Sequence, residues 1–78
     1  MQTEVRLPQL SMGMSDAEVV EWYAAEGQPV SEGDDLVEVE AEKARTVLPA
    51  PAGGVLSRIE AQPGDVVDVR GLLGIITT

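Results

Sequence analysis

The stretch EVEAEKARTV, residues 38–47, contains Lys43, the only lysine of the chain. The sequence has 14 carboxylates and five basic residues, but neither histidine nor cysteine. It therefore lacks the commonest general base and any thiolate for a metal site. Arginine serves ion pairing as well as lysine does, whereas lysine alone offers a primary amine that can be acylated. Lys43 is therefore a candidate attachment site, and the alternative is an ordinary solvated lysine.

Size, composition and charge limit the classes of function. The 78 residues suffice for one small domain, and 44% of them are apolar, with Trp22 and Tyr23 as the only aromatics. The net charge of −9 is uneven, because residues 1–42 hold eleven carboxylates and one arginine, whereas residues 43–78 hold three carboxylates and four basic groups. Nucleic acid and anionic membranes repel an acidic domain, so we expect neither as a partner. The charge fits basic patches on protein partners, or serves solubility alone.

Apolar and polar residues alternate in short runs that are separated by Gly and Pro, and this pattern predicts short strands. Val37 and Val39, for example, alternate with Glu38 and Glu40, which favours a strand with one apolar face. No window predicts a convincing amphipathic helix. Strands are expected at residues 3–8, 17–24, 35–40, 46–49, 54–60, 65–69 and 72–78.

The two halves of the chain resemble each other. RLP at 6–8 matches VLP at 47–49, and residues 19–27 match residues 55–64 with one extra residue in the second copy. The match then continues without gaps and pairs Gly27 with Gly64, Val30 with Val67, Leu36 with Leu73, and Val39 with Ile76. Each half provides about four short strands, too few to bury an apolar face alone. We expect an all-β fold, a flattened β-sandwich or barrel of two four-stranded sheets with pseudo-twofold symmetry.

The repeat also locates Lys43. Its matching position would lie beyond the last residue, so the equivalent of the lysine turn is the gap between the two termini. Lys43 is therefore expected at a β-hairpin tip, at the end of the sandwich opposite both termini. With Glu42 and Lys43 as tip residues, the expected cross-strand pairs are Ala41 with Ala44, and Glu40 with Arg45.

From Val5 to Ile76, the sequence resembles lipoyl domains, the swinging-arm modules of 2-oxo acid dehydrogenase complexes. The attachment motif of that family, ETDKA, reads EAEKA here, and the stretch LSMGMSDAEVVEW is similar to the opening of acyltransferase subunits, particularly those of acetoin-type complexes. The resemblance implies lipoic acid as a covalent amide on Lys43, with Glu40, Ala41, Glu42 and Ala44 as the recognition turn and Gly33 and Gly54 as supporting turns.

The sequence departs from the family pattern at two places. Ala41 and Glu42 replace the usual Thr and Asp, and Glu42 keeps the charge while adding a methylene group. Arg70 stands at the repeat position of Gly33, so its turn is expected to adopt a backbone that a non-glycine residue tolerates. Elsewhere, Trp22 is expected to be a partly buried core aromatic rather than a contact residue.

The first loop is longer than its counterpart in the second half. Ten residues lie between Pro8 and Val19, whereas five lie between Pro49 and Val55, so the first loop has five surplus residues. Such a loop lies near the lysine in lipoyl domains and helps the decarboxylase to recognise its partner; the alternative is a tolerated surface insertion. The expected partner contacts are Gln9, Leu10, Ser11, Met12, Gly13, Met14, Ser15 and Asp16, of which the two methionines are suited to adaptable surfaces.

The resemblance implies a carrier without catalytic residues or a metal site. Residues 1–78 are expected to form one lipoyl-type domain, excised from an acyltransferase subunit and served by a lipoate-protein ligase or lipoyl transferase. Its expected partners are a thiamine-dependent decarboxylase and dihydrolipoamide dehydrogenase. The amino terminus lacks the features of a signal peptide, which favours a cytoplasmic location, bacterial rather than the mitochondrial matrix. The alternatives are a biotin carrier, whose tip resembles Met-Lys-Met, and an unmodified hairpin sandwich used for assembly.

Overall fold

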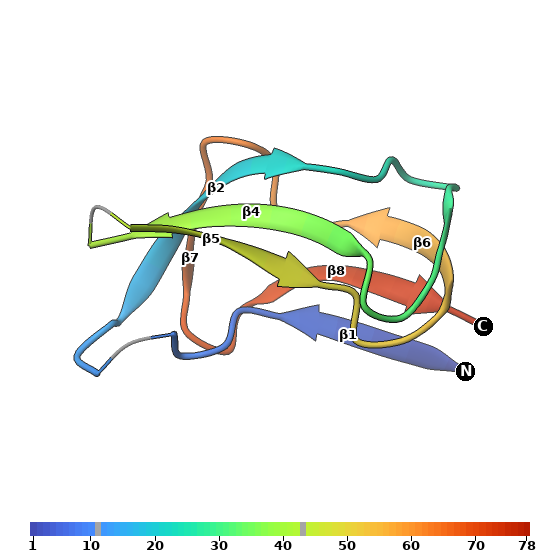
Figure 1. Cartoon of the computed structure of the whole chain (residues 1–78), viewed down its shortest axis with the longest axis horizontal. Coiled ribbons are helices and arrows are strands. Elements are labelled where there is room, and N and C mark those ends of the chain that lie inside the picture. Colours follow the sequence, from blue (N-terminus) through green and yellow to red (C-terminus); the bar gives the residue numbers. More distant parts are fainter. Residues whose placement is uncertain (11, 43) are drawn as a thin grey trace.

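The structure is a computed structural model that describes residues 1–10, 12–42 and 44–78 (Figure 1). Within these ranges the chain forms strands, and none of the described residues lies in a helix that is long and apolar enough to cross a membrane. The strands are β1 (Gln2–Arg6), β2 (Asp16–Trp22), β3 (Pro29–Val30), β4 (Asp35–Ala41), β5 (Ala44–Pro49), β6 (Gly54–Ile59), β7 (Val66–Asp68) and β8 (Leu72–Thr77).

The strands form two antiparallel sheets that are related by internal symmetry. One sheet has the order β1-β8-β6-β3, and the other has the order β5-β4-β2-β7. Exchanging the halves of the chain, so that β1 becomes β5 and each later strand moves by four, converts the first order into the second. Each sheet combines strands from both halves, so neither half can complete a sheet by itself. The predicted sandwich of two four-stranded sheets with pseudo-twofold symmetry is confirmed.

Backbone hydrogen bonds determine the register of the repeat. The Gly27 N–H donates to the carbonyl of Leu56 at 2.7 Å, and in the other half the Gly64 N–H donates to the carbonyl of Val19 at 2.8 Å. A register shift also follows Val19 in β2 and Leu56 in β6. Val19 is therefore equivalent to Leu56, and the extra residue expected in the second copy is absent. The sequence match paired Val19 with Val55 because both are valines, but Val55 faces outward and is exposed.

The first strand of each half is also displaced from the sequence match. Val5 pairs with Gly74, and Leu48 pairs with Val37 at the equivalent place in the other sheet. Val5 is thus equivalent to Leu48, and both side chains are buried. The expected match of RLP with VLP is wrong by two residues, because strand pairing and burial decide the register and a repeated Leu-Pro dipeptide does not.

The corrected register lengthens the first loop relative to its counterpart. Nine residues separate the buried Leu7 from Ala17, whereas three separate the equivalent residues Ala50 and Gly54. The surplus is therefore six residues rather than the expected five. The symmetric fold requires none of them, so the difference must be explained by something other than the sheets.

The core lies between the two sheets and draws on equivalent residues of both halves. Leu36 and Leu73 are completely buried, with 0% of each exposed, as the repeat predicted. Of the other paired positions, Val67 is half-buried, and the buried ones are Val30, Val39 and Ile76. Trp22 is half-buried against this core, and its Nε1–H donates to the carbonyl of Ala61 at 2.8 Å. The expectation that Trp22 is a partly buried core aromatic is confirmed.

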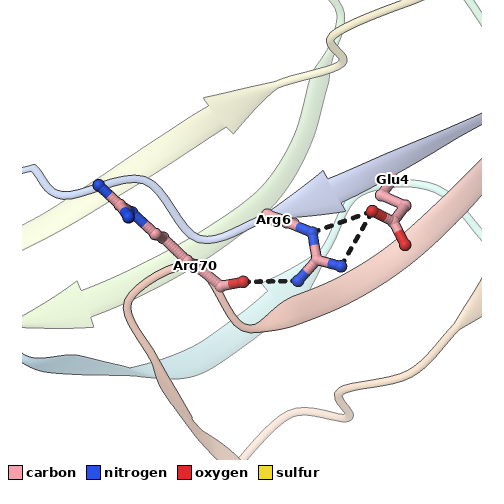
Figure 2. Close-up of polar contacts among 3 residues, drawn as sticks. All are labelled: Glu4, Arg6 and Arg70. Carbon is pink, nitrogen blue, oxygen red and sulfur yellow. Dashed lines mark hydrogen bonds and ion pairs between the residues drawn. The ribbon is translucent and has the colours of Figure 1, made fainter.

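The turns before β4 and β8 share an uncommon backbone. Gly33 has a φ of 90° and Arg70 has a φ of 72°, so both lie in the left-handed region that favours glycine. The sequence predicts for the turn at Arg70 a backbone that a non-glycine residue tolerates, but the φ of Arg70 lies in the region that favours glycine. Figure 2 shows a compensating contact that the glycine turn lacks: Arg6 Nη1 donates to the carbonyl of Arg70 at 2.7 Å, while its Nε and Nη2 donate to Glu4 at 3.0 and 2.9 Å.

The termini meet at one end of the sandwich. The Met1 carbonyl accepts a hydrogen bond from the Thr78 N–H at 2.9 Å, and the Met1 amino group donates to the Thr78 carbonyl at 3.2 Å. In the corrected register Met1 and Thr78 are equivalent to Ala44 and Ala41, the last pair of the β4–β5 ladder. That ladder ends at the opposite side of the molecule from both termini (Figure 1).

Candidate attachment site

The β4–β5 hairpin is built as the sequence predicted. Its ladder continues through Glu40 opposite Arg45 to Ala41 opposite Ala44, which leaves a two-residue connection. Arg45 Nε lies 3.3 Å from Glu40 Oε1. Both side chains are largely exposed, so this ion pair adds at most ~1 kcal/mol. Lys43, the second residue of the connection, lies outside the described residues.

Glu42 occupies a backbone conformation that suits it poorly. Its φ is 52°, in the left-handed region. A positive φ at the first residue of a two-residue connection is shared by the two turn types that match the twist of a hairpin, and Asn, Asp and Gly are the usual residues there. The departure from the family's Asp at this position therefore has a structural cost, since Glu is less tolerant of this conformation.

A surface cavity of about 290 Å³ lies directly beside the hairpin. The first loop and the start of β2 form one wall, and the end of β4 forms another. The lining residues are Met14, Ser15, Asp16, Ala17, Glu18, Glu40, Ala41, Glu42 and Val66. The cavity thus brings three of the expected loop residues together with three residues of the expected recognition turn.

The exposed part of the first loop contains two apolar side chains. Met12 is 97% exposed, and Leu10 is exposed as well. Gln9 and Gly13 are also exposed, while Ser11 lies outside the described residues. Two apolar side chains of the first loop are therefore accessible from solvent.

Met14 corrects one expectation for this loop. Its side chain is 5% exposed and belongs to the core, so it is not a surface contact. Its Sδ accepts a hydrogen bond from the Leu10 N–H at 3.4 Å, which ties the first loop to the sandwich. Met14 therefore anchors the loop, whereas Met12, two positions earlier, points into solvent.

Carboxylates oppose one another along β2. Directly paired positions carry like charges, which is unfavourable in an antiparallel sheet. The three pairs are Asp16 with Asp68, Glu18 with Glu40, and Glu21 with Glu38. The sheet that carries the hairpin is therefore strongly acidic beside the β4–β5 connection.

The pKa of Tyr23 is affected by the carboxylates of this surface. The Tyr23 hydroxyl donates to Glu38 Oε1 at 2.7 Å. This hydrogen bond, together with burial and the negative charges of Glu38, Glu21 and Asp35, raises the pKa of Tyr23 to about 12 from its ordinary value of 10.0. The neutral phenol is the form that the carboxylates favour.

Sequence reasoning missed three residues of the cavity, Ala17, Glu18 and Val66. Glu18 and Val66 pair with each other across β2 and β7, and Glu18 also pairs with Glu40. The alternation of β2 provides a signal for Glu18, since Ala17 and Val19 are buried and Glu18 must face outward. No local pattern indicates Val66, because its place depends on how β7 packs at the edge of the sheet.

Gly33 lies in the turn before β4, at the opposite end of that strand from the hairpin, and Gly54 begins β6 beside Thr77. The Gly33 N–H donates to the carbonyl of Ala50 at 2.9 Å. Gly54 has a φ of 150°, and a Cβ there would lie 2.5 Å from the carbonyl oxygen of Thr77. Both glycines therefore act through backbone geometry and close packing, and their roughly even spacing around Lys43 reflects the similar lengths of β4 and β5.

Comparison with known proteins agrees with this architecture. The biotin/lipoyl family model, described as "Biotin-requiring enzyme", matches residues 3–76. The chain is 38% identical over 76 residues to a dihydrolipoyllysine-residue succinyltransferase component of the 2-oxoglutarate dehydrogenase complex from Bartonella vinsonii subsp. berkhoffii. That alignment covers 97% of this chain and 18% of the relative, so the chain spans about a fifth of the relative's length.

Two solved structures share the fold. The lipoyl domain of the 2-oxoglutarate dehydrogenase complex from Azotobacter vinelandii has a TM-score of 0.79 and 28% identity, and the match covers 96% of this chain and 95% of that domain. A single-chain, multi-domain long-chain acyl-CoA carboxylase has a TM-score of 0.82 and 32% identity over 97% of this chain and 7% of its own. The chain therefore belongs to the biotin/lipoyl attachment family and is a lipoyl-type carrier domain.

Proposed function

We propose that Lys43 is the site of covalent lipoylation and that residues 1–78 act as one swinging-arm domain. One observation carries the proposal: the β4–β5 ladder closes at Ala41 opposite Ala44, and the two-residue connection that remains holds the only lysine of the chain. The hairpin lies opposite the termini. A domain tethered by a terminus would therefore present this connection outward.

The chemistry at Lys43 is acylation of an amine. The deprotonated amine attacks the activated carbonyl that a ligase or transferase supplies, a C–N bond forms, the bond from that carbonyl to its activating group breaks, and the activating group leaves together with a proton. The product is a neutral amide that takes the formal charge from −9 to −10. When bound, the lipoyl group supplies a dithiolane that accepts acyl groups and electrons. The protein's own residues provide exposure and orientation, through the ladder that ends at Ala41 and Ala44, and no residue is assigned a catalytic role.

Lipoate is favoured over biotin by the residues next to Lys43. Biotin carriers resemble Met-Lys-Met at this place, whereas Glu42 and Ala44 flank the lysine here. The relative in Bartonella is named as a dihydrolipoyllysine protein, while the carboxylase structure shares the fold at similar identity. The fold alone does not discriminate between the two cofactors, so the choice rests on the flanking residues and on that relative. The second candidate function is a biotin carrier.

We further propose the setting in which the domain works. It would form part of a longer acyltransferase subunit, in the bacterial cytoplasm, and would visit a thiamine-dependent decarboxylase and dihydrolipoamide dehydrogenase. The acidic surface along β2 supports docking to basic patches on such proteins. Glu40, Ala41 and Glu42 would serve recognition by the ligase, since they line the cavity beside the hairpin.

The first loop is proposed as the surface that the decarboxylase recognises. Its six surplus residues are not required by the symmetric sheets, and Leu10 and Met12 expose apolar surface. Ser15 and Asp16 would contribute through the shared cavity. Gln9, Ser11 and Gly13 complete the proposed contact segment.

Reductive acylation tests the carrier function. The domain is first lipoylated by a ligase and then incubated with a thiamine-dependent decarboxylase and its 2-oxo acid, and acyl incorporation is measured by mass. The wild-type domain is expected to be acylated once, whereas Lys43→Arg is expected to remain unmodified while keeping its fold. Acylation of the Lys43→Arg variant would exclude Lys43 as the carrier residue.

Loop shortening tests the recognition surface separately. Deleting residues 9–13 and Ser15 removes the surplus but keeps the buried Met14. Lipoylation is expected to proceed normally. The rate of reductive acylation is expected to fall, because the lipoylated domain then lacks the surface on which the decarboxylase docks. The fold of both domains is verified first. Equal acylation rates of the shortened and wild-type lipoylated domains would show that the loop is a tolerated insertion and not a recognition surface.

A further inference from the structure

The first loop holds two methionines in opposite environments. Met12 is 97% exposed, whereas Met14 is 5% exposed and belongs to the core. The Met14 sulfur also accepts a hydrogen bond from the Leu10 N–H at 3.4 Å. Two thioethers of the same type, two residues apart, thus differ almost completely in their access to solutes.

This difference has a chemical consequence, because oxidation of methionine follows exposure. Methionine sulfoxide is polar and chiral, whereas the thioether is apolar and flexible. An oxidant in solution therefore reaches Met12 freely, whereas Met14, which is 5% exposed, offers it very little surface. Burial of Met14 also means that oxidation of the loop leaves the sandwich intact.

Met12 lies on the segment that leads into the attachment site. Two residues further on, Met14 and Ser15 line the cavity that Glu40, Ala41 and Glu42 line from the other side. A change in polarity at Met12 therefore alters the loop surface beside the hairpin without touching the hairpin itself. Met12 is also the most exposed apolar side chain described within this loop.

We propose that Met12 is a reversible oxidation site that controls docking of the decarboxylase, an inference that rests on the proposed carrier function. A peroxide supplies the oxygen: the Met12 sulfur attacks one peroxide oxygen, the O–O bond breaks, an S–O bond forms, and water leaves. The sulfur loses two electrons and the peroxide gains them. A thiol-dependent methionine sulfoxide reductase reverses the change. The sulfoxide replaces an apolar contact with a polar one and weakens docking.

The first test locates the oxidation. The unlipoylated domain is treated with hydrogen peroxide, so that the sulfur atoms of the cofactor do not interfere, and each sulfoxide is located by fragment-ion mass spectrometry. Met12 is expected to oxidise about tenfold faster than Met14, as its exposure dictates. Met1, which is 95% exposed, serves as a second exposed reference. Equal rates for Met12 and Met14 would overturn the site.

The second test measures the consequence. Domain oxidised at Met12 is freed of peroxide, lipoylated, and compared with untreated domain in reductive acylation. The rate is expected to fall at least about threefold, to recover after reductase treatment, and to be unaffected by peroxide in Met12→Leu. Met1→Leu controls for the other exposed methionine. An unchanged rate in fully oxidised domain would refute control by Met12.

The two proposals fail in different ways. If untreated domain is neither lipoylated nor acylated, the carrier function fails, whereas selective oxidation of Met12 is still measured on the unlipoylated domain. If untreated domain is acylated normally and oxidised domain is acylated at the same rate, the carrier function stands and the regulatory role is excluded.

Discussion

At the scale of the residue, Glu42 is held in an unfavourable conformation immediately before Lys43, the proposed attachment site. Its φ of 52° is more easily adopted by Asn, Asp or Gly. The side chain also lines the acidic cavity, so its carboxylate lies where a ligase would meet the hairpin. The residue thus combines a structural cost with a position suited to recognition.

Replacing Glu42 is therefore expected to stabilise the fold. Glu42→Asn should raise the free energy of unfolding by ~0.5–1 kcal/mol, because Asn tolerates the left-handed region better. Urea denaturation measures the effect. Glu32→Asn, at an exposed position without a positive φ, is the matched control and should leave stability unchanged. A loss of stability in Glu42→Asn would contradict the strain assigned to this turn.

Tyr23 gives a direct measure of the acidic surface, since it is the only tyrosine of the chain. Its pKa is raised to about 12, chiefly by the hydrogen bond to Glu38. Between pH 10 and about 12 the folded chain keeps the phenolic proton that the unfolded chain has lost, so the stabilisation present below pH 10 is lost as the pH rises.

Ultraviolet titration of tyrosinate tests this relation. Glu38→Ala is expected to lower the pKa of Tyr23 towards 10, and Glu21→Ala, which removes a smaller contribution, should lower it less. A pKa that is unchanged in Glu38→Ala would contradict the assigned cause.

Some residues of the site could be predicted and others could not. The pairs Glu40–Arg45 and Ala41–Ala44 follow from a two-residue hairpin, since strand alternation then leaves one register. Met12 and Met14 look alike in sequence, and only the packing of the loop against the core separates them. Val66 carries no local signal at all.

At the scale of the element, two equivalent turns reach the same backbone by different means. Gly33 adopts a positive φ freely, whereas Arg70 adopts it with its carbonyl held by Arg6. The Arg6 contact has no counterpart at Gly33, because the residue equivalent to Arg6 is Pro49. The symmetry of the fold therefore extends to the turn conformations but not to the side chains that support them.

Exchanging the two residue types tests this account. Gly33→Ala should cost ~1–2 kcal/mol although the space around it is open, because the cost lies in the backbone. Arg70→Gly should not destabilise the domain, since the gain in the turn offsets the greater entropy of the unfolded chain. Thermal denaturation compares both with wild type. A marked loss of stability in Arg70→Gly would show that its side chain, rather than its backbone, holds the turn.

At the scale of the whole molecule, pseudo-twofold symmetry places the hairpin opposite the termini. Each sheet takes strands from both halves, so the core forms only when the halves interlock. The symmetric arrangement could be predicted because the apolar positions near Leu36 and Leu73 recur at a constant spacing. The register of the first strand of each half could not be predicted. The repeated Leu-Pro dipeptide indicated the wrong register, and the strand pairing and bulges that determine the correct one are seen only in the structure.

Equivalent core residues of the two halves should contribute similar amounts to the free energy of unfolding. Leu36→Ala and Leu73→Ala are each expected to cost ~2–5 kcal/mol, because both side chains are completely buried. Val66→Ala, at an exposed position, should cost little. Chemical denaturation measures all three. Losses below ~0.5 kcal/mol for both leucine variants would contradict the paired core.

The central claim, that Lys43 carries a lipoyl group, is tested most directly by intact mass. The purified domain is incubated separately with a lipoate ligase and lipoate and with a biotin ligase and biotin, each with its own control substrate. The account predicts the addition of one lipoyl group, no biotin, and no addition to Lys43→Ala. A wild-type domain that stays unmodified while the lipoyl control domain is modified, or one that takes up biotin alone, would contradict it.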